Sequence, residues 1–172
     1  MNASPSTVAA PGVGWQQPSR SWPETKGPQI ALQVLLYPML DDRNETPSSR
    51  EIVDIGIWDR DLNVEARRYL LGETSETATD TGKIQVSAYA APARGADLSG
   101  LPPTYLDVGE LDTFRDDDIV FANRLMAAGV PVETHVHPGG IHAGELLAPA
   151  ATLSTRISGY RREALNRALT ER

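Results

Sequence analysis

One strand–helix–strand unit in the second half of the chain constrains the fold more than any other feature of the sequence. Residues 104–108 form a β-rich run that we expect to end at Gly109, and residues 132–137 alternate as a second strand does. Between them, a helix over 116–128 is expected, with three acids in its first turn and Gly129 as its stop. A helical crossover returns the chain in the same direction, so the two strands should pair in parallel.

A further strand is expected near residue 30. Residues 30–37 are mostly apolar and are bounded by Pro28 and Pro38, which is typical of a strand buried on both faces of a parallel sheet. The polar residues that follow, 41–49, indicate a loop. Together with the strand–helix–strand unit, this strand predicts an α/β fold with a mostly parallel sheet flanked by helices.

Apolar residues recur at helical spacing in three segments, and each segment is expected to present one apolar face. The segments are 61–71, which Gly72 closes, then 116–128, and a last helix over 153–168. The residues expected on these faces are Leu62, Ala66, Tyr69 and Leu70; Ile119, Phe121, Leu125 and Met126; and Leu153, Ile157, Tyr160, Ala164 and Ala168.

Length, charge and composition exclude several classes of protein. At 172 residues the chain fits one domain, and a net charge of -7 argues against a nucleic-acid binder, so the arginine pairs 67–68 and 161–162 are expected on solvated helix faces. The absence of cysteine excludes disulfides, thiol catalysis and cysteine-based zinc sites. The longest apolar stretch, 30–40, is shorter than the ~20 residues of a membrane helix, and no signal peptide opens the sequence. We therefore expect a cytoplasmic protein.

Asp112 and His142 each come shortly after a predicted strand. If the strands 104–108 and 132–137 are neighbours in the sheet, both loops emerge at the same rim and the two side chains can meet. A carboxylate beside an imidazole fixes its tautomer and stabilises the imidazolium, as the acid and base of a serine hydrolase do. An aspartate in a turn can equally be a cap or a loop former. No Gly-x-Ser-x-Gly turn is present anywhere in the chain.

Several segments, taken in order, resemble one family. They are ALQVLLYPMLDD at 31–42, ADLSGLPP at 96–103, GELDTFRD at 109–116, AAGVPV at 127–132 and PGGIH at 138–142. From Gln29 onward the chain resembles the C-terminal half of the hormone-sensitive-lipase group of α/β-hydrolases, which includes bacterial carboxylesterases. The resemblance implies a C-terminal portion of the hydrolase sheet whose N-terminal strands are missing. It also implies Asp112 as the triad acid, His142 as the triad base, no cofactor, and a small acyl ester as the substrate of intact relatives.

The chain departs from the pattern of this family in four places. Thr113 stands where the family usually has Pro, and Ala143 and Gly144 stand where it has Gly-Phe. The His-Gly-Gly-Gly oxyanion segment and the Gly-Asp-Ser-Ala-Gly nucleophile elbow are both missing. Oxyanion donors account for ~10²–10³ in rate and the nucleophile for more, so we expect no ester hydrolysis by this chain alone through the family mechanism.

Residues 1–28 are expected to be a disordered or irregular tail, ahead of a partial α/β-hydrolase domain over 29–172. The tail is rich in Pro, Ser, Gly and Thr and has little apolar periodicity. Because Trp has one codon, Trp22 restricts the shifted reading frame, which there permits Leu-Ala-Arg-Asp-Lys-Gly, typical of the end of the elbow helix. We hypothesise that the tail is an out-of-frame reading of the elbow region. An ordinary disordered tail is the alternative.

Two other functions fit parts of the sequence. The first is a metal site, because His135, His137 and His142 are the only histidines and the first two would share a strand face. The alternation over 132–137 is more simply explained by one buried and one exposed strand face. The second is a non-catalytic interaction or dimerisation module. Without N-terminal strands, a hydrophobic sheet edge beside 30–37 would be bare, and such an edge forms homo-oligomers or aggregates.

Four serines could be proposed as substitutes for the missing nucleophile. They are Ser48, Ser49, Ser87 and Ser99. None of them lies on a strand-to-helix Gly-x-Ser-x-Gly turn, and loop polarity explains each one.

Overall fold

Three parallel strands form the sheet of the computed structural model, which describes residues 30–72 and 86–170. In sheet order the strands are β1 (Gln33–Leu36), β2 (Thr104–Leu111) and β3 (Val132–Ile141). Both neighbouring pairs run in parallel, and the chain passes from β2 to β3 through a helix. The predicted parallel strand–helix–strand unit and the α/β class are therefore confirmed.

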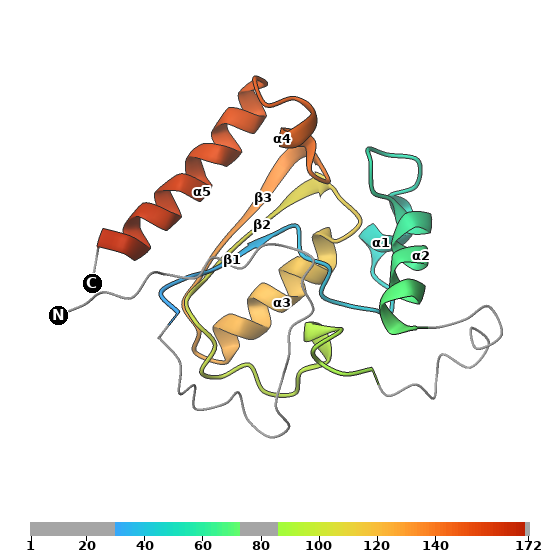
Figure 1. The fold of residues 1–172 in the computed structure, drawn as a ribbon, viewed down its shortest axis with the longest axis horizontal. Helices are drawn as coiled ribbons and strands as arrows, with labels where there is room; N and C mark the ends of the chain where they lie inside the picture. Colours follow the sequence, from blue (N-terminus) through green and yellow to red (C-terminus); the bar gives the residue numbers. More distant parts are fainter. Residues whose placement is uncertain (1–29, 73–85, 171–172) are drawn as a thin grey trace.

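Helices cover both faces of this sheet, α3 one face and α5 the other (Figure 1). The helices in chain order are α1 (Pro47–Glu51), α2 (Arg60–Leu71), α3 (Arg115–Ala127), α4 (Gly144–Leu147) and α5 (Thr152–Thr170), with a short 3-10 turn, η1, at Pro92–Arg94. Leu106 of β2 belongs to the core shared with Leu125 of α3, whereas Tyr105 belongs to the core shared with Ala164 of α5. Successive side chains of β2 thus point to opposite faces, which places one apolar core on each side of the sheet.

The ends of the strands differ from those predicted. β1 begins at Gln33 and is shorter than the predicted 30–37, while β2 and β3 run further than predicted, to Leu111 and Ile141. Gly109 is predicted to end β2 but lies inside the strand. At this point the backbones of β2 and β3 come unusually close. A Cβ atom at Gly109 would lie 2.3 Å from the carbonyl oxygen of Gly140, so only glycine allows this approach.

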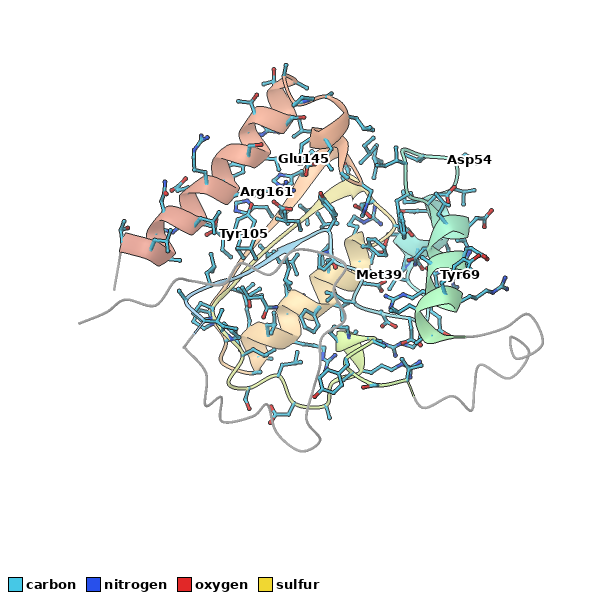
Figure 2. The ribbon with its side chains drawn as sticks, in the orientation of Figure 1. Met39, Asp54, Tyr69, Tyr105, Glu145 and Arg161 are labelled. Atoms are coloured by element: carbon cyan, nitrogen blue, oxygen red, sulfur yellow. The ribbon has the colours of Figure 1, made fainter. Side chains whose placement is uncertain are left out.

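The side of helix α2 that packs against the rest of the protein is polar. The prediction that this helix buries an apolar face is therefore wrong. Asn63 and Arg67 are its buried residues. Leu62 and Leu70 are exposed, and Tyr69 is 80% exposed on the outer side of the helix (Figure 2). Arg67 is buried because its guanidinium donates to the carbonyl oxygens of Asp41, at 2.6 Å, and Ala90, at 3.1 Å. The prediction of a solvated Arg67 is therefore also wrong.

The helix α3 follows its predicted face only in part. Phe121 and Leu125 are buried as predicted, but Ile119 and Met126 are exposed. Two acids of the first turn, Asp117 and Asp118, are buried instead.

The helix α5 buries Ile157 and Ala164 on its predicted face. Of its arginine pair, Arg162 is exposed as predicted. The side chain of Arg161 is only 15% exposed, because it pairs with Asp107 of β2. The prediction of a solvated side chain is therefore wrong for Arg161.

Two further predictions concern the loop at 41–49 and the tail. α1 replaces the end of the predicted loop, since residues 47–51 are helical. The predicted tail, 1–28, lies outside the described residues. Among the helices that are described, none is both long and apolar enough to cross a membrane.

Candidate active site

Asp112 and His142 meet at one rim of the sheet. Asp112 is the first residue after β2, and His142 is the first residue after β3. Because these strands are parallel neighbours, their carboxyl ends lie side by side. Nδ1 of His142 lies 3.0 Å from Oδ2 of Asp112. The predicted meeting of these two side chains is therefore confirmed.

The environment of Asp112 fixes its orientation. The side chain is 0% exposed, whereas that of His142 is 14% exposed. Oδ1 of Asp112 accepts a hydrogen bond of 3.0 Å from the backbone N–H of Phe114, which leaves Oδ2 for the imidazole. A carboxylate only accepts, so Nδ1 of a neutral His142 carries the proton. Nε2, which has no hydrogen-bond partner among the described residues, is then the ring nitrogen that can act as a base.

Three aromatic rings surround the imidazole of His142. The ring centroid of Tyr37 lies 4.5 Å from that of His142, edge to face, and that of Phe114 lies at 5.4 Å. Trp58 stacks on the imidazole with centroids 5.6 Å apart. Sequence reasoning missed all three. Only Phe114, two residues after Asp112, carried a signal of proximity; Tyr37 and Trp58 come from distant segments of the chain.

Ser48 and Ser49, two of the serines proposed as substitutes, make structural hydrogen bonds. Ser48 is fully buried in α1, where its Oγ donates to the carbonyl of Thr113 at 3.1 Å and accepts from the N–H of Asp116 at 3.0 Å. Ser49 is also buried in α1, and its Oγ donates to the carbonyl oxygen of Thr46. Loop polarity is therefore the wrong explanation for Ser48 and Ser49. In the described part of the chain no serine is hydrogen-bonded to His142.

Ser87 and Ser99, the other two of the four proposed serines, do lie outside the helices and strands. Ser87 Oγ accepts from the N–H of Tyr89 at 3.2 Å, and the N–H of Ser99 donates to Asp97 at 2.8 Å. Both serines shape local turns, as predicted.

The three histidines do not form one cluster. His135 and His137 stack on Tyr160 of α5, whereas His142 lies against Asp112 and its aromatic neighbours. Within 30–72 and 86–170, no group of three or more His, Asp or Glu side chains is placed to hold a metal ion. His135, His137 and His142 therefore do not come together as the metal hypothesis requires. On β3 the histidine side is the more buried one, since His137 is buried and Val136 is exposed.

Two acids of α3, Asp117 and Asp118, are buried, and Asp118 interacts electrostatically with Asp112. Burial, with the charges of Asp112 and Asp117, raises the pKa of Asp118 well above its ordinary value. Burial and the charge of Asp41 raise the pKa of Asp117 to about 6. Neither oxygen of Asp118 has a hydrogen-bond partner among the described residues, which agrees with a carboxyl group that stays neutral.

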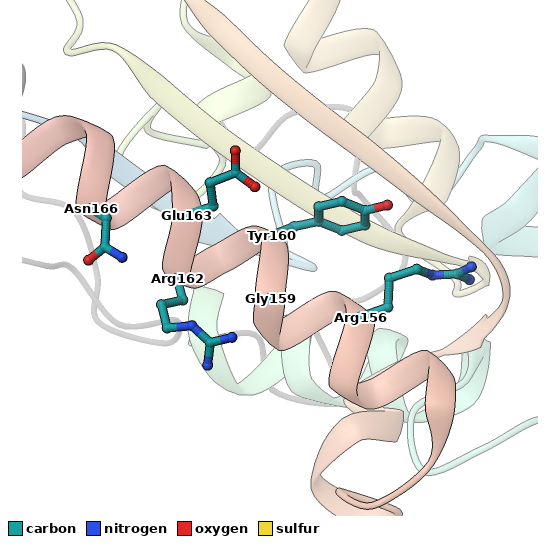
Figure 3. Close-up of a pocket in the computed structure, with 6 residues that line it drawn as sticks. All are labelled: Arg156, Gly159, Tyr160, Arg162, Glu163 and Asn166. Atoms are coloured by element: carbon teal, nitrogen blue, oxygen red, sulfur yellow. The ribbon is translucent and has the colours of Figure 1, made fainter.

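A shallow hollow of about 400 Å³ lies on α5 (Figure 3). Its lining residues are Arg156, Gly159, Tyr160, Arg162, Glu163 and Asn166. All of them belong to one helix, and none is a partner of Asp112 or His142, so this hollow is separate from the acid–base pair.

Known proteins similar to this chain share its fold but are longer. A family model described as alpha/beta hydrolase fold matches residues 19–145, and so begins before Gln29, the predicted start of the resemblance. Esterase LipI of Mycobacterium tuberculosis is 37% identical over 75% of this chain and 39% of the relative. Carboxylesterase NlhH of the same organism is 34% identical over 83% of this chain and 43% of the relative.

Two solved structures similar to this chain are also esterases of which it covers less than half. A bacterial heroin esterase has a TM-score of 0.74 and 44% identity, with 81% of this chain and 43% of that protein covered. The esterase LipW of Mycobacterium marinum has a TM-score of 0.71 and 34% identity, with 83% and 42% covered. The chain spans about two fifths of the length of these relatives. It belongs to the α/β-hydrolase fold family, in the hormone-sensitive-lipase-like group.

Proposed function

We propose that this chain carries the acid and the base of a serine-type carboxylic ester hydrolase, with Asp112 as the acid and His142 as the base. The observation that carries the proposal is the 3.0 Å contact between Nδ1 of His142 and Oδ2 of Asp112, whose side chain is fully buried. Relatives named esterase and carboxylesterase give the substrate class, a carboxylic ester.

In the proposed reaction, Nε2 of His142 takes the proton of a serine hydroxyl as the hydroxyl attacks the ester carbonyl. The imidazolium that forms is stabilised by the Asp112 carboxylate, which accepts from Nδ1 throughout. His142 then returns the proton to the departing alkoxide, so the alcohol leaves neutral. The aromatic rings of Tyr37, Trp58 and Phe114 limit the orientations that the imidazole can take.

The nucleophile is not supplied by a serine elbow of this sequence, because no Gly-x-Ser-x-Gly segment is present. We therefore expect the chain alone to be inactive in ester hydrolysis by the serine mechanism. Two measurements test this: labelling with a fluorophosphonate probe and hydrolysis of p-nitrophenyl acetate. The expected result is no labelled serine and no acyl-enzyme burst. A serine labelled at stoichiometric yield would contradict the proposal.

The acid–base roles are tested by supplying the missing part. A chimera joins the N-terminal portion of the Mycobacterium tuberculosis carboxylesterase to residues 29–172 of this chain. We expect the folded chimera to hydrolyse p-nitrophenyl esters and Asp112→Asn to lower kcat by about 10⁴, because the wrong histidine tautomer is then favoured. Asp61→Asn, at an exposed position of α2, is the matched control. An unchanged kcat in the Asp112→Asn chimera would contradict the assignment.

Association of the chain with itself is the second candidate function. β1 is an end strand of the described sheet, and it pairs only with β2 among the described strands. Such an edge can accept a strand from a second copy. Light scattering over a hundredfold range of concentration tests this candidate. A mass that rises above the 18.6 kDa of one chain supports self-association, and a constant 18.6 kDa contradicts it.

A further inference from the structure

A buried carboxylate of β2 anchors one residue of the C-terminal helix. Asp107 is 0% exposed, and Arg161 of α5 holds it with two contacts, Nε to Oδ2 at 2.7 Å and Nη2 to Oδ1 at 2.9 Å. The hydroxyl of Tyr105 donates to the same carboxylate at 2.9 Å. Burial alone would raise the pKa of Asp107, but His137, Arg161 and Tyr105 lower it below its ordinary value. Asp107 is therefore a charged anchor inside the protein.

The same guanidinium reaches the helix that follows the candidate base. Nη1 of Arg161 lies 2.5 Å from Oε1 of Glu145 in α4. The Glu145 side chain is only 9% exposed, and Glu145 comes three residues after His142. Arg161 and Glu145 lie between α5 and the strands, where Arg161 bridges β2 to α4 (Figure 2). One planar guanidinium thus joins two carboxylates, as its forked geometry allows.

Glu145 in turn holds a ring that touches His142. The hydroxyl of Tyr37 donates to Oε1 of Glu145 at 3.1 Å. Burial, together with the charge of Glu145, raises the pKa of Tyr37 to about 12, so its hydroxyl keeps its proton. The Tyr37 ring then meets the imidazole of His142 edge to face, with centroids 4.5 Å apart. Contacts thus run without a break from Asp107 through Arg161, Glu145 and Tyr37 to His142.

From these contacts we infer that Arg161 is a positioning residue for the base. It clamps α4 to β2 and, through Glu145, holds Tyr37 against the imidazole, so that Nδ1 of His142 keeps facing Asp112. This inference rests on the proposed acid–base function of the pair. Arg161 does not touch Asp112 or His142 in any contact of the described residues, so it acts only through the groups it holds.

The NMR signal of the His142 imidazole can test this inference. The full chain has three histidines, which makes its imidazole ¹H–¹⁵N NMR spectrum simple. An Nδ1 proton that is hydrogen-bonded to a carboxylate gives a downfield signal, and His142 is expected to give one. The first variant is Tyr37→Phe, which removes only the hydroxyl that donates to Glu145. The second is Arg161→Lys, which keeps the charge and removes the two-pronged contact.

We expect both variants to lose or broaden the downfield His142 signal, and Tyr37→Phe to leave the His135 signals unchanged. Arg162→Gln is the matched control, because this neighbouring arginine is exposed and points away from the strands (Figure 3). The control should keep the signal. If Arg161→Lys does not fold, Tyr37→Phe alone decides the outcome.

A parent-like His142 signal in the folded variants overturns the positioning role of Arg161. Asp112→Asn separates this inference from the proposed function. If Asp112→Asn leaves the signal in place, the acid–base pairing itself is wrong. If Asp112→Asn removes the signal but the clamp variants keep it, only the inference about Arg161 is wrong.

Discussion

At the scale of single residues, the residue after the candidate base carries backbone strain. Ala143 has φ of +51° and links His142 to α4. A left-handed conformation costs a non-glycine residue about 1–2 kcal/mol, which glycine avoids. Ala128, at the end of α3 with φ of -83°, is the matched site without this strain. We expect Ala143→Gly to be more favourable than Ala128→Gly by about 1–2 kcal/mol in urea unfolding. Equal effects would mean that Ala143 stores no strain.

The buried side chain of Asp118 predicts that the stability of the protein depends on pH. The pKa of Asp118 is raised in the folded chain, so the native state holds its proton at pH values where the unfolded state has lost it. Stability should therefore fall as the pH rises from about 4, the unfolded value, through the raised folded value. Asp118→Asn removes this loss. Unfolding free energies of the two proteins should be similar at pH 4, and the variant should be increasingly favoured toward pH 8. A difference that does not grow with pH contradicts a neutral Asp118.

At the scale of elements, the sequence predicts the order and type of the long elements but not every buried face. The strands over 104–108 and 132–137 and their crossover helix follow from local periodicity and glycine stops. The face of α2 does not, because Arg67 is buried by hydrogen bonds to carbonyl groups far along the chain. In the same way Trp58 reaches His142 from a separate loop, and nothing in its local sequence indicates that contact.

The buried arginine of α2 can be tested directly. Arg67→Leu leaves the carbonyl oxygens of Asp41 and Ala90 without their donors, and each buried, unpaired polar group costs about 1–3 kcal/mol. We expect a loss of about 2–6 kcal/mol in urea unfolding. Arg68→Leu, at the exposed neighbouring position, should change stability by only about 0.5 kcal/mol. Similar losses in both variants would show that Arg67 does not hold α2 in place.

At the scale of the whole molecule, one sheet rim joins the fold to the proposed chemistry. We propose Asp112 and His142 as the acid and base of a triad, and the parallel pairing of β2 and β3 brings them within hydrogen-bond distance. The sequence could not show how the two strands converge there. Their register shifts between Gly109 and Leu111, next to the close approach of Gly140. The geometry of the pair therefore depends on a backbone contact that no side-chain pattern reveals.

The close approach of β2 and β3 leads to the last prediction: two Gly→Ala substitutions should change the stability of the protein in opposite directions. At Gly109 the new methyl group would lie 2.3 Å from the carbonyl oxygen of Gly140, so β2 and β3 must separate just before Asp112 and His142. At Gly159, inside α5, a Cβ meets nothing within 4 Å.

We expect Gly159→Ala to gain about 0.5–1 kcal/mol, because alanine restricts the unfolded chain. Gly109→Ala should instead lose stability and the downfield imidazole signal of His142 together. Thermal unfolding and the same NMR spectrum measure both effects. A stable Gly109→Ala protein that keeps the signal would show that the close approach of the strands does not set the geometry of the acid–base pair.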